Sequence, residues 1–190
     1  MAQGMYSYMR GAWRKPSREM LQPRMIQWRA GESVVKVEKP LRLDRARTLG
    51  YKAKQGIIVV RVRVKRGGRK RTRHKHGRKS RKQYTRKILK MSYQWVAELR
   101  AAHHYPNLEV LNSYLLGKDG KYYFYEVILL DPERPEIKAD PVYAWVSTGT
   151  HTGRVYRGLT SAAKKSRGLR SKSPDLKVRP SARAWERQGK

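Results

Sequence analysis

The chain of 190 residues carries 46 Lys or Arg against 14 Asp or Glu, a formal net charge of +32. This charge argues against a neutral enzyme of small-molecule metabolism, because self-repulsion destabilises a compact state that has no anionic partner; with a pI near 11.0, it indicates nucleic acid as that partner. The absence of cysteine excludes disulfides, thiolate zinc sites and a cysteine nucleophile, and no apolar run reaches the roughly 18 residues that a membrane span requires.

Helices are expected in the first part of the chain, before the first strand. Their large apolar residues are Trp13, Met20, Met25, Ile26 and Trp28. Pro16 and Pro23 interrupt this series. Ser17, followed by Met20 and Leu21, favours a helix start, and Pro23 is expected to kink the helix that begins there.

The segment 57–66, IIVVRVRVKR, alternates between apolar and basic residues. Val60, Val62 and Val64 fall on one side, and Arg61, Arg63 and Lys65 fall on the other. Because successive side chains of a strand point to opposite faces, this pattern predicts a half-buried strand whose outer face is cationic.

A strongly basic insert at about 67–87 follows this strand. Residues 61–90 contain 16 basic side chains and no acidic one. Gly67, Gly68 and Gly77 allow the chain to turn and to approach another backbone. Arginine forks match phosphate oxygens and stack on bases, and lysine adds mobile charge. A charge run can also be merely solvated, but the length of this one favours a long loop that binds nucleic acid.

A helix and a β-hairpin are expected next. The helical spacing is carried by Ile88, Met91, Trp95, Leu99 and Ala102. Pro106 ends this helix. The runs 110–116 and 121–131 are rich in β-branched and aromatic residues, and the loop GKDG joins them as a hairpin. The order of these elements predicts an α+β fold with a small mixed or antiparallel sheet and packed helices.

The charge is divided unevenly along the chain. Residues 91–141 hold 5 basic and 8 acidic side chains, whereas the segments on either side are strongly basic. We therefore expect a single α+β domain over 1–153, which includes the N-terminal helices and the basic insert. Residues 154–190 have few large apolar side chains, so they are expected to form an extended basic C-terminal tail that is unfolded until it binds.

Residues for catalysis or metal binding are poorly represented. His74 and His76 have no cysteine or carboxylate nearby to complete a zinc site, and the surrounding cations would repel a metal ion. The carboxylates nearest to one another in a turn are Asp131, Glu133, Glu136 and Asp140. Pro132 and Pro135 break this segment, so solvated caps are favoured over a two-metal nuclease site. We expect no enzyme activity, no metal or other cofactor and no small-molecule substrate.

DNA packaging is the main alternative, because chromatin-type proteins also combine basic extensions with few acids. Three features favour RNA instead. Arginine outnumbers lysine, the acid-rich segment interrupts the positive charge, and the basic insert lies inside the domain. Folded RNA offers irregular crevices that suit a globular body with unequal extensions.

Several blocks of the sequence resemble a known family. They are LGYKAKQG (49–56), RVRVKRGGRKR (61–71), VLNSY (110–114), YEVILLDP (125–132) and RGLTSAAKKSRGL (157–169), together with the aromatic opening YSYMRGAWRK (6–15). In this order they are similar to large-subunit ribosomal protein fifteen of the archaeal and eukaryotic "e" type, with the short tail of an archaeal member. The resemblance extends over about residues 5–185.

The resemblance implies a structural, non-catalytic constituent of the large ribosomal subunit, located in the cytoplasm. Its partners would be large-subunit ribosomal RNA and neighbouring ribosomal proteins, with no membrane. By matching blocks, the implied RNA contacts are Lys52, Lys54, Arg61, Arg63, Arg66, Arg69, Lys70, Arg71, Arg157, Lys164, Lys165 and Arg167. The basic character of the insert and tail adds Arg73, Arg78, Lys79, Arg81, Lys82 and Arg170.

Overall fold

A computed structural model describes residues 4–70, 75–78, 86–87 and 91–170. The helices are α1 (Met5–Arg14), α2 (Arg18–Ala30), α3 (Leu43–Thr48), α4 (Tyr93–His104), α5 (Pro135–Lys138) and α6 (Ser161–Ser166), with the 3₁₀ turns η1 (Ala144–Ser147) and η2 (Gly149–His151). The strands are β1 (Val34–Val37), β2 (Ile57–Lys65), β3 (Arg69–Lys70), β4 (Arg86–Lys87), β5 (Glu109–Lys118) and β6 (Tyr122–Leu130). These elements confirm the α+β class.

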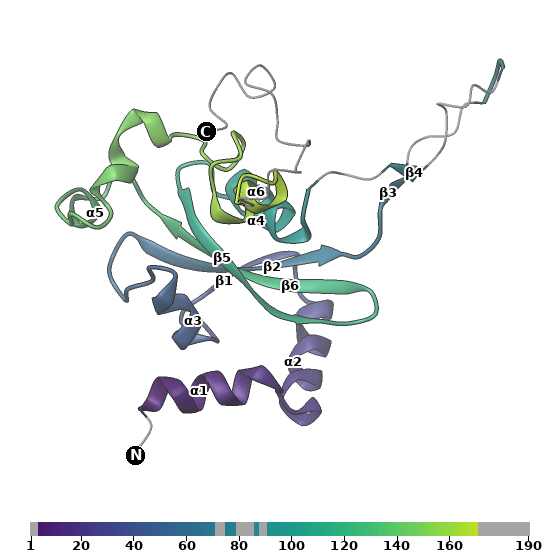
Figure 1. Cartoon of the computed structure of the whole chain (residues 1–190), viewed down its shortest axis with the longest axis horizontal. Helices are drawn as coiled ribbons and strands as arrows, with labels where there is room; N and C mark the ends of the chain where they lie inside the picture. Colours follow the sequence, from purple (N-terminus) through teal and green to yellow (C-terminus); the bar gives the residue numbers. More distant parts are fainter. Residues whose placement is uncertain (1–3, 71–74, 79–85, 88–90, 171–190) are drawn as a thin grey trace.

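Four strands form one antiparallel sheet in the order β1-β2-β6-β5. The predicted hairpin is confirmed as β5 and β6. Its turn is stabilised by Asp119, whose Oδ1 accepts the backbone N–H groups of Lys121 and Tyr122 at 2.7 and 2.6 Å. Figure 1 shows α4 and α6 on one side of this sheet and α2 and α3 on the other, with α1 furthest from the strands.

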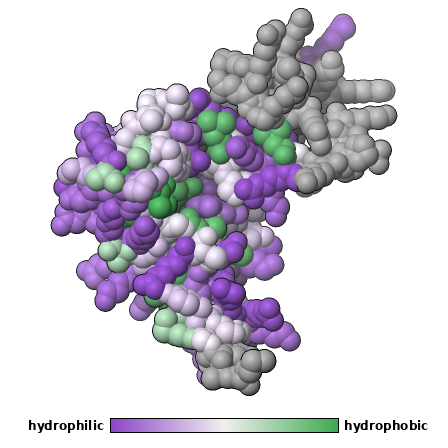
Figure 2. Space-filling view, turned by 60° about the vertical axis from the view of Figure 1, so that its left-hand side comes forward, coloured by the Kyte–Doolittle hydropathy of each residue, from purple (hydrophilic) through white to green (hydrophobic). Residues whose placement is uncertain are grey.

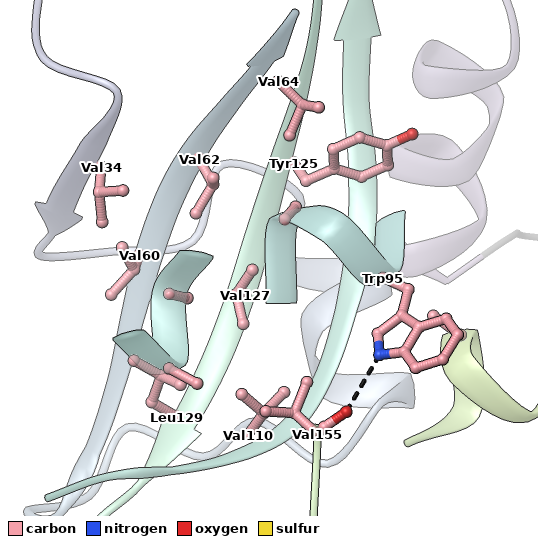
Figure 3. Close-up of a cluster of buried hydrophobic side chains, with 14 of the residues drawn as sticks. Val34, Val60, Val62, Val64, Trp95, Val110, Tyr125, Val127, Leu129 and Val155 are labelled. Atoms are coloured by element: carbon pink, nitrogen blue, oxygen red, sulfur yellow. Dashed lines mark hydrogen bonds between the residues drawn. The ribbon is translucent and has the colours of Figure 1, made fainter. Parts of the chain in front are cut away.

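The face of the sheet that α4 covers holds the first hydrophobic core. Val60, Val62 and Val64 of β2 are buried here, as the alternation predicts, together with Trp95 of α4. The indole Nε1 of Trp95 donates a hydrogen bond of 3.0 Å to the carbonyl of Val155 (Figure 3). This bond ties the helix to a segment that lies 60 residues further along the chain.

The opposite face of the sheet is also covered, which corrects the prediction of an exposed cationic face for β2. Trp28 of α2, Ala46 of α3 and Phe124 of β6 are buried there in a second core. Arg61 and Arg63 lie on this face and are half-buried. The alternation is correct, but it does not reveal that an N-terminal helix lies across the basic side of the strand.

Helix α4 begins later than its apolar spacing predicts. Ser92 caps the helix by accepting the N–H of Trp95 on its Oγ at 3.2 Å. Met91 precedes this cap and is 43% exposed, while Ile88 lies outside the described residues. The helix ends at His104, just before Pro106, as expected.

Residues of the segment 154–170, which the sequence assigns to the extended tail, pack against the body. Val155 and Ala163 are almost fully buried in the first core. Arg154 donates hydrogen bonds to the carbonyls of Val110 and Leu111 in β5. Small residues such as Ala162 and Ala163 allow α6 to approach α4 closely, so this segment packs despite its lack of large apolar side chains. Residues 171–190 of the expected tail lie outside the described residues.

A buried carboxylate joins three elements of this body. Glu98 of α4 is fully buried and accepts hydrogen bonds from the hydroxyl groups of Ser113 in β5 and Thr160, the N-cap of α6. Burial raises the pKa of Glu98, and the two hydroxyl donors and nearby Arg154 oppose that rise. The carboxyl group therefore holds its proton at a pH where the unfolded chain has lost it.

Replacement of Glu98 tests this linkage. Because the folded pKa lies above the ordinary 4.5, the free energy of unfolding should fall as pH rises through the window between 4.5 and the folded value. Glu98→Gln should show a smaller fall, because only Glu126, whose pKa burial also raises, still contributes to it. Glu98→Ala should lose about 2–4 kcal/mol through a cavity and two hydroxyl groups that lose their acceptor. Urea unfolding across this pH range measures both effects. The exposed Glu32→Gln variant should retain the wild-type pH profile, and an unchanged profile for Glu98→Gln would contradict the assignment.

Candidate nucleic-acid interface

Cations lie against aromatic rings throughout the body. Seven such contacts have distances of 4.9–5.8 Å to the ring centroid: Arg42 on Trp13, Arg47 on Tyr6, Lys52 on Tyr143, Arg61 on Trp28, Arg63 on Tyr122, Arg66 on Tyr123 and Arg154 on Trp145. Each contact is worth about 0.5–2 kcal/mol, depending on exposure. They hold part of the positive charge in defined positions.

Three arginines that were predicted to contact RNA, two in β2 and one just after it, contact the protein itself. Arg61 lies over the Trp28 ring, and burial lowers its pKa, which nearby Glu126 partly restores. Arg63 donates to the carbonyls of Trp28 and Arg29 at the end of α2. Arg66 donates to the carbonyl of Asp119 at 2.7 Å. These guanidinium groups thus join β2 to α2 and to the β5–β6 turn. Their protein contacts favour a structural role over direct contact with RNA.

Tyrosine side chains anchor the start of the basic insert. The hydroxyl of Tyr93 accepts the N–H of Gly67 at 2.9 Å, and its ring stacks on Tyr123 at 4.8 Å, which in turn stacks on Tyr125. Beyond Gly67, β3 and β4 pair antiparallel, and Figure 1 shows this pair projecting from the body. The direction in which the insert leaves the sheet is therefore set by the core.

Most of the candidate residues in the insert fall outside the described ranges. Arg71, Arg73, Lys79, Arg81 and Lys82 lie outside the described residues, and Arg69 and Lys70 are described only by the backbone pairing of β3. Arg78 is described and exposed.

Lys52 and Lys54 share one carboxylate. Their Nζ atoms lie 3.4 and 2.9 Å from Asp140 Oδ2. The hydrogen bond from Lys54 is the main reason that the pKa of Asp140 is lowered to about 2, and the N–H of Val142 also contributes. The pair therefore offers an anionic ligand a net single positive charge.

The basic residues near the C-terminal helix divide into two groups. Arg167 is buried and donates to the carbonyl of Gly158 at 2.9 Å, and Arg157 donates to the carbonyls of Thr150 and Thr152. Their inward contacts argue against both as primary RNA contacts. Lys164, Lys165 and Arg170 are exposed on and after α6.

Sequence reasoning missed a group of arginines near the N-terminus. Arg10 and Arg14 of α1 face Arg42 and Arg45, which lie at and near the start of α3, across a pocket of about 370 Å³. The i,i+4 spacing of Arg10 and Arg14 was a usable signal, since it places both on one side of a helix. Nothing in the sequence indicates that α3 would lie opposite them.

Several carboxylates are removed from the surface. Asp44, Glu98 and Glu126 are buried, and Asp119, Asp131 and Asp140 form salt bridges with Arg or Lys. Glu98 and Glu126 belong to the acid-rich segment 91–141, and the three paired aspartates lie in it too, so five of its eight carboxylates are buried or paired with a cation. Hydrophilic residues cover much of the face seen in Figure 2. The described surface therefore presents many cations with few competing anions.

The described part of the chain offers no metal cluster and no membrane-spanning helix. It contains no group of three or more His, Asp or Glu side chains arranged to hold a metal ion. None of its helices has both the length and the apolar character needed to cross a bilayer.

Comparison with known proteins gives the family. The family model described as Ribosomal L15, of the L15e type, matches residues 4–185. The chain belongs to this family. The curated "Large ribosomal subunit protein eL15" of the archaeon Methanocella arvoryzae is 50% identical over 196 residues, covering the whole of both chains.

The Ribosomal L15 match confirms the resemblance drawn from the sequence blocks. It includes helix α1, the basic insert and the segment around α6 in a single family unit. The N-terminal arginines and the exposed cations near α6 thus belong to the part of the chain that the family shares.

The Asp140 cluster yields a direct titration test. Lys54→Ala should raise the pKa of Asp140 from about 2 toward its ordinary 3.8, and Lys52→Ala should raise it less because its Nζ is further away. Since the folded pKa is depressed, the stability from this carboxylate is present above 3.8 and is lost as pH falls to about 2. NMR titration of Asp140 measures the shift. Lys138→Ala serves as the control, and a larger shift in Lys52→Ala than in Lys54→Ala would contradict this geometry.

Proposed function

We propose that this chain is a structural constituent of the large ribosomal subunit, where it binds and stabilises folded ribosomal RNA. The observation that carries the proposal is the family match over residues 4–185. The related archaeal protein is named as a component of that subunit. The surface agrees with this role, because many of its lysines and arginines are exposed while several carboxylates are buried or paired.

The proposed mechanism is electrostatic support of RNA by a rigid body. The antiparallel sheet and the helices on it hold the start of the basic insert and the α6 region in separate directions, and α1 lies on a further side, against the α3 region. Each lysine or arginine that meets a phosphate releases counterions and so adds affinity. RNA segments that would repel one another can then lie against different sides of the same protein. Recognition would depend on the shape of the folded RNA more than on its base sequence.

The proposed direct contacts are the exposed cations. Among the predicted residues that the structure describes, direct contact is assigned to Arg78, Lys164, Lys165 and Arg170, which are exposed. The insert residues outside the described ranges remain candidates, as does the Lys52–Lys54 pair. Arg61, Arg63 and Arg66 are assigned a supporting role, because their guanidinium groups already contact protein. Neighbouring ribosomal proteins are proposed as further partners in the cytoplasmic subunit.

The proposal assigns no reaction to the chain. The carboxylates around Pro132 serve local structure: Asp131 accepts the N–H of Glu133 at 3.0 Å, and Asp140 accepts that of Val142 at 3.0 Å. These are capping contacts of a turn, as the flanking prolines suggest, and Asp140 is further neutralised by two lysines.

The purified chain should prefer a large-subunit ribosomal RNA transcript to duplex DNA of equal length at equal salt. With six to ten phosphate contacts, its RNA affinity should fall by roughly 10³–10⁵ between 50 and 200 mM salt. Competition binding at several salt concentrations measures both properties. Equal affinity for the two polymers would favour the DNA-packaging alternative, and co-sedimentation of the endogenous protein with the nucleoid would support that outcome.

The exposed cations on and after α6 should contribute to RNA binding beyond their effect on net charge. The triple variant Lys164→Gln, Lys165→Gln, Arg170→Gln should reduce the salt slope of RNA binding by about 2 and leave the thermal unfolding midpoint nearly unchanged. The control removes the same charge at Lys118, Lys121 and Lys138, which are exposed beside Asp119 and Glu136. A local negative charge weakens their attraction for phosphate, so their loss should matter less. Equal losses in both triples would show that only net charge counts.

A further inference from the structure

Helix α1 and the region of α3 enclose a pocket rich in arginine. Its volume is about 370 Å³, within the range of small-ligand sites. The lining residues are Arg10, Trp13, Arg14, Arg42, Asp44, Arg45 and Thr48. We refer to this pocket as the α1–α3 seam.

The seam carries positive charge that the protein does not balance with ion pairs. None of the four salt bridges among the described residues includes Arg10, Arg14, Arg42 or Arg45. The one carboxylate in the lining, Asp44, is only 5% exposed. Two arginines from each side therefore line the same pocket, and the single carboxylate in the lining is largely buried.

The attachment of α1 to the body is correspondingly thin. No residue of α1 is buried. Its contacts with the α3 region include the Trp13 ring beneath the Arg42 guanidinium, at 5.0 Å, and the Tyr6 ring and hydroxyl against Arg47. Like charges across the seam oppose these two contacts. An anion placed between the arginine pairs would convert this repulsion into attraction for both sides.

We propose that the α1–α3 seam binds a phosphodiester group of ribosomal RNA and that this binding holds α1 against the body. The inference rests on the proposed function, and it adds a site and a structural consequence. Arginine forks from both sides can donate to the same phosphate oxygens. The volume leaves room for the attached ribose beside Trp13. The N-terminal helix would thus complete its packing only on RNA.

Hydrogen–deuterium exchange of the full chain tests the proposal, with a large-subunit ribosomal RNA transcript as the probe. In the wild-type protein, RNA should slow exchange of the amides of residues 5–14 by about tenfold or more, because binding stabilises the docked helix. Arg14→Gln with Arg45→Gln should abolish most of this slowing and reduce the salt slope of RNA binding by about 1–2. Both arginines are exposed, so the fold should survive, as a thermal melt will verify.

The control removes the same charge from the edge strand β1 and the loop after it, with Lys36→Gln and Lys39→Gln, both exposed. It should keep the slow exchange of α1 on RNA. If the seam variant binds RNA and still shows wild-type slowing of α1, the inference is wrong and the proposed function stands. If the wild-type chain does not bind the transcript, both fail. Equal slowing by inorganic phosphate at the same phosphate concentration would overturn the assignment to RNA.

Discussion

Guanidinium groups that lie on aromatic rings and against main-chain carbonyls connect the helices of this protein to its sheet. Arg61 rests on Trp28, and Arg63 donates to the end of the same helix, so α2 is held across β2 by cations. A chain with a net charge of +32 has too few carboxylates to neutralise its arginines by ion pairs. Ring faces and carbonyl oxygens are acceptors that need no acidic residue, and they allow part of the positive charge to stabilise the fold.

Two of the few carboxylates join distant segments inside the structure. Glu98 accepts two hydroxyl groups on one side of the sheet, and Glu126 accepts the Tyr114 hydroxyl and the Leu41 N–H on the other. Burial raises the pKa of both glutamates. Each joins segments that are distant along the chain, which specifies the packing of α6 and of the loop before α3. The exposed surface is left to lysine and arginine, as a phosphate-binding protein requires.

The sequence predicts that the surface binds RNA, but it predicts only part of the residues that make the contacts. Net charge and the acid-free insert indicate RNA binding without any structure, and the family match agrees. Individual contacts are less predictable, because a basic residue can serve the protein or its ligand. Arg167 resembles Lys164 and Lys165 in sequence context, yet its side chain is buried against Gly158. The α1–α3 seam could not be predicted from the sequence, because its two arginine pairs are about 30 residues apart and come together only through tertiary packing.

Local patterns determined much of the secondary structure. The alternation in β2, the hairpin around Asp119 and the Ser17 cap arise from neighbouring residues, so the sequence alone predicts them. Tertiary packing decided which faces are covered. Helix α2 buries the cationic side of β2, and residues 154–170 join the core although they contain few large apolar side chains. Such burial depends on contacts between distant segments, namely the Trp95–Val155 hydrogen bond and the Glu98 network, and no local pattern of charge or hydropathy encodes them.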